Sequence, residues 1–121
     1  MPSSPTAKRA TPPEVEARLA AGILVNALIR HVEAEGGHGI VIARGDATAG
    51  ALLIELRDRG EAGPLLERTL GNGGYAWRDS GPADPSERAD YLARRRKSDP
   101  DLWILELDHP RARELASAIL D

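Results

Sequence analysis

Apolar residues in the first third of the chain recur at intervals of three and four, the period of an amphipathic helix. Residues 11–14 have the spacing of a helix N-cap, a first-turn proline and an N3 acid. The apolar stripe continues to Val32, and the glycine pair at 36–37 supplies a C-cap. We therefore expect a helix over about residues 12–35, bent or broken at Gly22.

The period changes to two over residues 39–79, and glycines divide this region into four strands of an antiparallel meander. The run Ile40–Ala43 has no polar face, so we expect it in the interior of the sheet. Segment 45–50 is then the hairpin loop that joins it to a second strand, 52–57, in which apolar and charged residues alternate.

Alternation at residues 66–70 and 75–77 predicts the third and fourth strands of the meander. The glycine-rich segments 60–64 and 71–74 are the turns that precede and join them. This pair carries fewer large apolar residues than the first pair, so we expect it to form an edge of the sheet.

The last third of the chain predicts a helix, a strand and a second helix. Residues 84–87 repeat the cap, proline and N3-acid spacing and predict a helix over about 85–97. The run Leu102–Leu107 is almost wholly apolar, which is typical of a strand covered on both faces, so we expect it at the centre of the sheet. Pro110 opens a final helix with a single apolar stripe.

These elements predict an α+β fold with an N-terminal helix, a four-strand antiparallel meander, a helix, a central strand and a C-terminal helix. The helices pack against the sheet, because an apolar helix stripe and an apolar sheet face each need a partner. Residues 1–10 are rich in Ser, Pro, Thr and Ala and predict a disordered tail. We assign residues 11–121 to one α+β domain.

Composition narrows the functional classes. The chain has 121 residues, 41% hydrophobic and 29% charged, as expected for one globular domain. It has no cysteine, which excludes thiol catalysis, disulfides and cysteine-ligated zinc. A formal charge of -3 provides no field that would hold a polyanion, so we expect no nucleic-acid partner.

No export signal or membrane segment is recognisable. Glu14, Glu16 and Arg18 fall where a signal peptide needs its apolar region. The longest uncharged run, 19–29, is shorter than the ~20 residues of a membrane-spanning helix, so we expect a cytoplasmic protein without a membrane partner.

This run is also a large apolar surface for so small a chain. We therefore expect self-association, as a homodimer by default, through a sheet edge or the N-terminal helix.

Two segments resemble a known family. One is Arg44–Ala51, with the sequence RGDATAGA. The other runs from Tyr91–Arg94 into Asp99–Glu106, with the sequence DPDLWILE. Together they resemble the bacterial family known as domain of unknown function 1491, over residues 18–108. The resemblance implies a compact bacterial cytoplasmic domain and carries over no catalytic residue and no cofactor.

Segment 44–50 permits two interpretations. In the first it is a turn in which Gly45 and Gly50 adopt positive φ while Asp46 binds nearby backbone amides. In the second the loop amides form a nest that binds an anion. The segment contains no lysine and no Gly-Lys-Ser/Thr sequence, so a nucleotide-phosphate loop is excluded.

Asp99, Asp101, Glu106 and Asp108 form the densest acidic group in the sequence. On an extended strand Glu106 and Asp108 point the same way, and two such carboxylates could serve acid–base chemistry or hold a divalent cation. The simpler interpretation is structural. Asp99 and Asp101 then form a turn around Pro100, while Asp108 caps the last helix.

The remaining polar candidates favour structural roles. His31, His38 and His109 have no metal-ligand spacing, so we expect surface histidines, no metal site and no cofactor. The basic run 94–97 fans out around its helix and predicts a solvated helix end. Trp103 lies on the apolar face of its strand, and we expect it in the core.

Two functional hypotheses follow. The first is a binding or assembly module without catalytic activity, because no set of nucleophile, base and metal ligands is present, and its partner is an unidentified protein or small molecule. The second is a small hydrolase-like or cation-dependent enzyme that uses Asp46, Asp99 and Asp101 beside Arg44. These four residues are the candidate ligand-binding residues. Convergence of the three carboxylates in a concave site would favour the enzyme.

Overall fold

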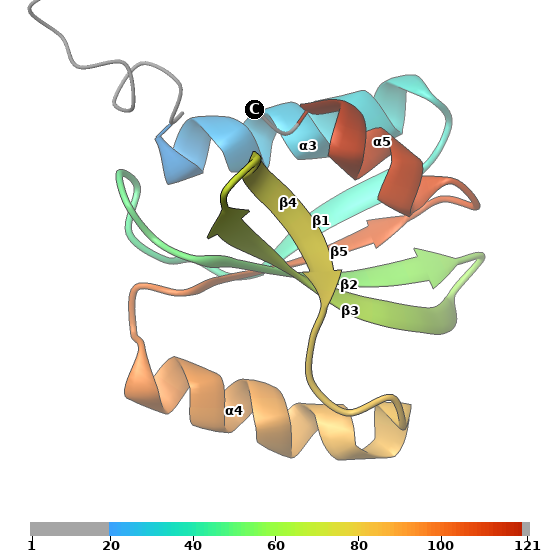
Figure 1. Ribbon diagram of the computed structural model, residues 1–121. Coiled ribbons are helices and arrows are strands. Elements are labelled where there is room, and N and C mark those ends of the chain that lie inside the picture. The colour runs from blue at the N-terminus through green and yellow to red at the C-terminus, as the bar shows by residue number, and fades with distance from the viewer. Residues whose placement is uncertain (1–19, 120–121) are drawn as a thin grey trace, which may run out of the picture.

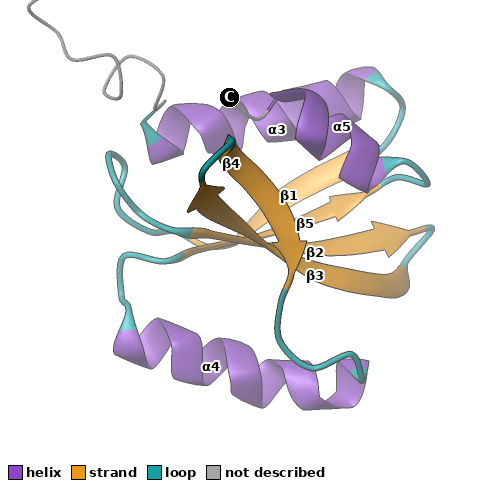
Figure 2. Cartoon of the chain, in the orientation of Figure 1, coloured by secondary structure: helices purple, strands orange, loops and turns teal. Residues whose placement is uncertain are grey.

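A twisted sheet lies between two layers of helices (Figure 1). The computed structural model describes residues 20–119. Figure 2 shows α3 and α5 on one face of the five-stranded sheet and α4 on the other. The elements in chain order are α3 (Ala21–Ala34), β1 (His38–Ala43), β2 (Leu52–Asp58), β3 (Glu61–Gly71), β4 (Gly74–Asp79), the 3-10 helix η1 (Pro85–Glu87), α4 (Arg88–Ser98), β5 (Trp103–Asp108) and α5 (Ala112–Ile119).

The main core lies between the sheet and helices α3 and α5. Each helix packs its apolar stripe against the sheet. Every second residue of a strand points to the same face, so alternate strand residues enter this core. Trp103 belongs to this cluster and is 2% exposed, so its expected burial is confirmed. The largest contributions to the cluster come from Leu24, Leu28, Leu52, Ile54, Leu66, Trp77, Trp103, Leu105 and Leu107.

Helix α4 packs on the opposite face over a much smaller apolar cluster. Leu53, Leu65, Leu102 and Ile104 are buried there, and the half-buried Tyr91 and Leu92 of α4 pack against them. Because Leu65 and Leu66 alternate along β3, they contribute to opposite cores.

The sheet has mixed strand directions, and the predicted four-strand antiparallel meander is wrong. The strand order is β1-β5-β2-β3-β4, with β5 antiparallel to β1 and parallel to β2. Segment 45–50 is therefore not a hairpin loop, because β5 separates the strands that it connects. The prediction assumed that strands adjacent in the sequence pair with each other. Strand β5, the most apolar strand, instead takes an inner position, where strands flank it on both sides.

Strand β1 is an edge strand and does not lie in the sheet interior as predicted. Ile40 is 52% exposed and Ile42 is 49% exposed, whereas Val41 packs on the main core and Ala43 on the cluster beneath α4. The pairing with β5 shifts between Val41 and Ala43, so Ile42 is the extra residue of a β-bulge.

The β2–β3 turn is tighter than predicted. The predicted turn covered residues 60–64, whereas β3 already begins at Glu61 and the turn is Arg59–Gly60. Both residues have positive φ, 53° and 84°, the conformation of a type I′ hairpin turn. Arginine is an unusual residue at the first of these positions, and this is why composition did not reveal the turn.

Most described helix ends agree with the sequence. Gly36 follows α3 with a φ of 90°, and the Asp84 side chain accepts a hydrogen bond from the Ser86 N–H at 3.0 Å, as an N-cap does. Helix α3 begins at Ala21 with Ala20 in an extended conformation, so the break expected at Gly22 falls at Ala20, and Gly22 lies inside α3. The predicted tail and the predicted cap at residues 11–14 lie outside the described residues.

Candidate functional site

The two segments that carry the family resemblance lie side by side. The Asp46 N–H donates to the Asp101 carbonyl oxygen at 3.0 Å. The Trp103 indole N–H donates to the Asp46 carbonyl oxygen at 2.7 Å. The loop after β1 is therefore held against the entry to β5 mainly by backbone groups, and it contributes the carbonyls of Ala47 and Thr48 to the first amides of α3.

The glycines of this loop are required by close packing. A Cβ at Gly45 or Gly50 would collide with the Asp101 carbonyl oxygen, and a Cβ at Gly50 would also collide with the Trp103 ring. Neither glycine has positive φ, so that part of the turn prediction is wrong. The two glycines instead allow β5 and the loop to approach each other.

Two of the three candidate carboxylates are used by the backbone around them. The Asp46 carboxylate accepts the N–H groups of Thr48 and Ala49 at 3.0 and 2.8 Å, as the turn interpretation predicts. The Asp99 carboxylate accepts the Asp101 N–H at 3.1 Å and so forms the expected turn around Pro100. The Asp101 side chain is exposed and makes no hydrogen bond within residues 20–119.

Arg44 lies apart from this hydrogen bonding. Its guanidinium is 5.3 Å from the Trp103 ring centroid, a cation–π contact. It borders a cavity of about 380 Å³ whose lining comes from Ala20 and α3, β1 and the following loop, and Trp103 of β5, and does not include the three carboxylates. Within residues 20–119 no three His, Asp or Glu side chains are grouped to hold a metal ion.

Arg96 of α4 binds both segments. Its Nη1 donates to the carbonyl oxygens of Arg44, Pro100 and Leu102 at 2.9, 2.8 and 2.7 Å. The prediction of a solvated helix end at 94–97 is therefore wrong for Arg96 and also for the half-buried Arg95, although Arg94 and Lys97 are exposed. Consecutive helical residues point in different directions, so one basic run can include solvated and half-buried members.

A second polar region lies at the other end of α4, around Arg88. This residue is the only buried charged residue among those that the structure describes, with 5% exposure. Its Nε donates to the Pro82 carbonyl oxygen at a long 3.3 Å, and its Nη1 is 4.0 Å from the Glu55 carboxylate. Within residues 20–119 neither terminal nitrogen of Arg88 makes a hydrogen bond, and both keep some contact with solvent.

Arg88 lines a cavity of about 440 Å³ between β3 and the chain that follows β4. The other walls are residues 62–65, 79–83 and Pro85, most of them small or apolar. Asp79 is the one acidic residue of this lining, and its carboxylate is 2.7 Å from the Arg113 guanidinium.

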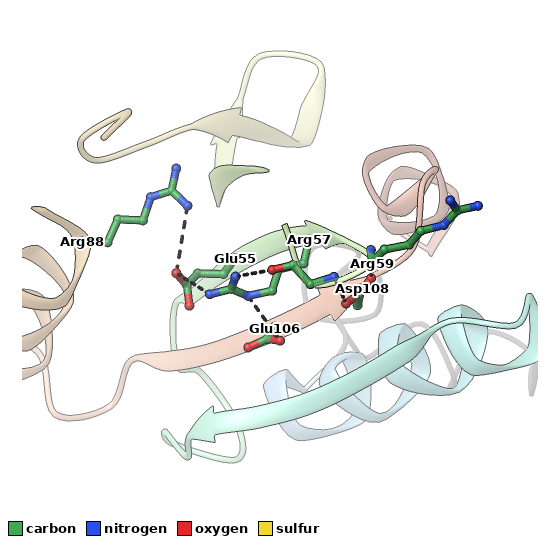
Figure 3. Close-up of polar contacts among 7 residues, drawn as sticks. Glu55, Arg57, Arg59, Arg88, Glu106 and Asp108 are labelled. Carbon is green, nitrogen blue, oxygen red and sulfur yellow. Dashed lines mark hydrogen bonds and ion pairs between the residues drawn. The ribbon is translucent and has the colours of Figure 1, made fainter. Parts of the chain in front are cut away.

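Charged residues continue from Arg88 along the face of the sheet on which α4 lies (Figure 3). Glu55 and Glu106 are direct neighbours on β2 and β5, and two like charges in that position repel each other. Arg57 relieves this repulsion, with its guanidinium 3.3 Å from Glu106 and 4.0 Å from Glu55. Glu55 thus lies between two guanidinium groups and makes no direct hydrogen bond to either of them.

Asp108 does not have the role that the sequence suggested, and His109 takes it instead. The Asp108 carboxylate accepts the N–H groups of Arg59 and Gly60 at 2.8 and 2.9 Å and so holds the type I′ turn. The predicted cap of the last helix by Asp108 is therefore wrong. His109 takes that position, because its Nδ1 accepts the Arg111 N–H at 2.9 Å just before α5.

A third polar group fastens the middle of α4 to β3. Both terminal nitrogens of Arg95 donate to the Glu67 carboxylate, at 3.0 and 2.9 Å, and Nη1 also donates to the Tyr91 hydroxyl at 2.8 Å. The hydrogen bonds from Arg95 lower the pKa of Glu67, and a further bond from Ser80 acts in the same direction against the effect of burial. The hydrogen bonds between Arg95 and Glu67 also raise the pKa of Arg95.

Sequence reasoning missed Arg88, Arg95, Arg96, Glu55 and Arg57. A signal for the first two was present, because Arg88, Tyr91 and Arg95 recur at helical spacing and so share one face of α4. That face was not considered as the buried one, since arginine is rarely buried unless it is paired.

Comparisons with known proteins place the chain among related sequences and structures. The family model described as Protein of unknown function (DUF1491) matches residues 19–117. A crystal structure of a DUF1491 family protein from Caulobacter crescentus CB15 is similar, with 31% identity, a TM-score of 0.70 and coverage of 80% of this chain and 94% of that one. A solution structure of protein Atu0922 from A. tumefaciens has 30% identity, a TM-score of 0.62 and coverage of 75% and 86%. No curated protein sequence matches the chain.

Proposed function

The chain belongs to the DUF1491 family, whose function is unknown, and from this starting point we propose that it is a binding module for a ligand that carries a carboxylate group. The ligand enters the cavity beside Arg88 and pairs with the guanidinium of that residue. This proposal develops the hypothesis of a binding module without catalytic activity. No helix among the described residues is long and apolar enough to cross a membrane.

The observation that carries the proposal is the hydrogen bonding of Arg88. A guanidinium has five N–H donors in a planar fork. Within residues 20–119 the buried Arg88 uses one of them, at 3.3 Å, and its nearest carboxylate is 4.0 Å away. Although the side chain as a whole is buried, its terminal nitrogens keep some contact with solvent, so a ligand in the cavity can reach them. A ligand carboxylate could accept two parallel bonds from this fork.

The walls of the cavity fit a ligand with an apolar body. Leu65, Pro64, Pro82 and Pro85 provide apolar surface around Arg88. Binding sites for small molecules combine apolar walls with a few placed polar groups. The charge of Asp79 is already compensated by Arg113, so it does not cancel that of Arg88.

The test is calorimetric titration with 4-methylpentanoate and with its neutral amide. We expect the wild-type protein to bind the acid and to bind the amide at least about tenfold more weakly, the ratio expected for bonds to a charged group. Arg88→Met should remove this preference. Arg94→Met removes the same charge from an exposed position of the same helix and should leave the preference unchanged. Equal binding of acid and amide, or full binding by Arg88→Met in its folded state, would contradict the proposal.

The site predicted at Arg44, Asp46, Asp99 and Asp101 stays a hypothesis. The meeting of the two segments supports it, whereas the use of two carboxylates by backbone N–H groups supports a structural role. The two interpretations differ in what Asp101 does, because it is the one of the three carboxylates that makes no hydrogen bond among the described residues.

Assembly of two copies is a second candidate function, favoured by strand β1. This edge strand exposes Ile40 and Ile42, and His38–Ala43 contains no Asp, Glu, Lys or Arg. Two identical β1 strands can therefore approach without repulsion between like charges, and the edge lacks the lysine or proline that commonly protects an edge. Sedimentation should show a dimer at high micromolar concentration that Ile40→Lys converts to monomer. A wild-type protein that stays monomeric would refute this candidate.

A further inference from the structure

We propose that the carboxylate bound by Arg88 is the C-terminus of an extended peptide, which adds as a short strand to the open part of β3. This inference rests on the binding function proposed above and names the kind of ligand. A peptide C-terminus combines one carboxylate with a run of backbone N–H and C=O groups. The Arg88 guanidinium suits the carboxylate, and the open edge of β3 suits the backbone groups.

The first observation is an unpaired stretch of strand. Strand β3 begins at Glu61 and pairs with β2 from its first residue, but β4 pairs with β3 only from Leu66 onward. The Ser80 N–H still donates to the Leu65 carbonyl at 2.8 Å, and the chain then leaves the sheet at Gly81. Among the described residues, positions 61–64 therefore have a strand neighbour on one side only.

The second observation is that this edge and Arg88 line the same cavity. Residues 62–65 form one wall, and Arg88 comes from the start of α4 on the other side of the departing chain. A peptide that continues the line of β4 along β3 therefore enters the cavity in which the guanidinium lies. Ala62 and Gly63 have the smallest side chains of this wall and permit a second backbone to come close.

The chemistry of the walls defines the last residue of the peptide. Apolar surface from Leu65, Pro82 and Pro85 surrounds the position beside Arg88, so the terminal side chain should be aliphatic. Pro64 has no N–H, so the edge offers few donors and the terminal carboxylate has to supply much of the affinity. This makes a free C-terminus a requirement for binding.

The experiment uses the full chain and a pool of acetylated tetrapeptides that end in Leu, Ile or Val. The pool is prepared as free acids, as C-terminal amides and as free acids with N-methylated backbones, and binding is followed by the amide NMR signals of Gly63 and Gly81. We expect the free acids to shift both signals and to bind at least about tenfold more tightly than the amides. N-methylation should weaken binding severalfold, because it removes strand pairing. Arg88→Met should abolish the effect and Arg94→Met should preserve it.

The outcomes separate this inference from the proposed function. If 4-methylpentanoate binds as tightly as the free-acid peptides and N-methylation changes nothing, the peptide inference is wrong while the carboxylate site stands. If neither the peptides nor 4-methylpentanoate bind, both are wrong. Peptide amides that bind as well as the acids would also overturn the inference, because Arg88 would then have no part in recognition.

Discussion

The two faces of the sheet are covered by layers of opposite character (Figure 2). On one face α3 and α5 build a cluster of sixteen buried hydrophobic residues among those that the structure describes. On the other face α4 covers a cluster of four, and much of its attachment comes from three arginines, Arg88, Arg95 and Arg96. The apolar layer therefore supplies most of the stability, because burial of apolar surface is the dominant favourable term in folding.

The polar layer has a different role, which is to fix the position of α4. Hydrogen bonds and ion pairs are directional, so they fix where α4 lies and depend strongly on geometry. The terminal nitrogens of Arg95 and Nη1 of Arg96 donate hydrogen bonds of 2.7 to 3.0 Å, whereas Arg88 makes one hydrogen bond, of 3.3 Å, and its nearest carboxylate is 4.0 Å away. Within one helix Arg95 and Arg96 therefore fasten α4 to the rest of the fold, whereas Arg88 lines a cavity and neither of its terminal nitrogens makes a hydrogen bond among the described residues.

The largest expected effect belongs to the apolar layer. Trp103→Ala removes a buried ring, its hydrogen bond to Asp46 and its contact with Arg44, and we expect a loss of about 3–5 kcal/mol in the free energy of unfolding. Urea denaturation measures this loss. A loss below about 1 kcal/mol would contradict the assignment of stability to this layer.

Arg96→Met tests the polar layer directly. The substitution leaves the carbonyls of Arg44, Pro100 and Leu102 without this donor, and we expect a loss of about 1–3 kcal/mol in the free energy of unfolding. Lys97→Met is the matched control, because Lys97 is exposed on the same helix turn, and should stay within about 0.5 kcal/mol of wild type. Equal losses in the two variants would mean that the three carbonyl contacts do not stabilise the fold.

The pH dependence of stability distinguishes the layers further. The hydrogen bonds from Arg95 hold the pKa of Glu67 below the value of about 4.3 that it has in the unfolded chain. The ionised Glu67 therefore stabilises the fold fully at pH values above its unfolded-state pKa. This stabilisation is lost as the pH falls through the lower pKa of Glu67 in the folded state. Glu67→Gln should lose about 0.5–1 kcal/mol at neutral pH and show a smaller decrease between neutral and acidic pH than wild type. Parallel pH profiles for the two proteins would contradict this assignment.

The smallest effect is expected at Asp101. This residue acts through its backbone, so Asp101→Asn should change the free energy of unfolding by less than about 0.5 kcal/mol. Asp99→Ala, which removes the bond to the Asp101 N–H, should cost about 0.5–2 kcal/mol. If Asp101→Asn leaves stability intact but abolishes a measured binding or turnover, the site hypothesis at Arg44, Asp46, Asp99 and Asp101 gains support over the structural one.

The candidate site was partly predictable. The sequence identified the two segments that meet at Asp46 and Asp101, and the use of Asp46 and Asp99 in turns followed from their positions beside glycine and proline. It did not identify Arg88, because its role depends on burial. Burial of a charged side chain is decided by the elements that surround it, and here those elements are β3 and the chain after β4.

The sequence by itself determined the local elements, since caps, periodicity and turn residues act over a few positions. It correctly marked the end of α3, the start of η1 and the apolar strand β5, whose observed bounds differ by one residue from the predicted run. Only the tertiary structure decided which strands pair, because pairing is set by the competition of whole strands for covered positions. That competition placed β5 between β1 and β2, left β1 at the edge, and left part of β3 open beside Arg88.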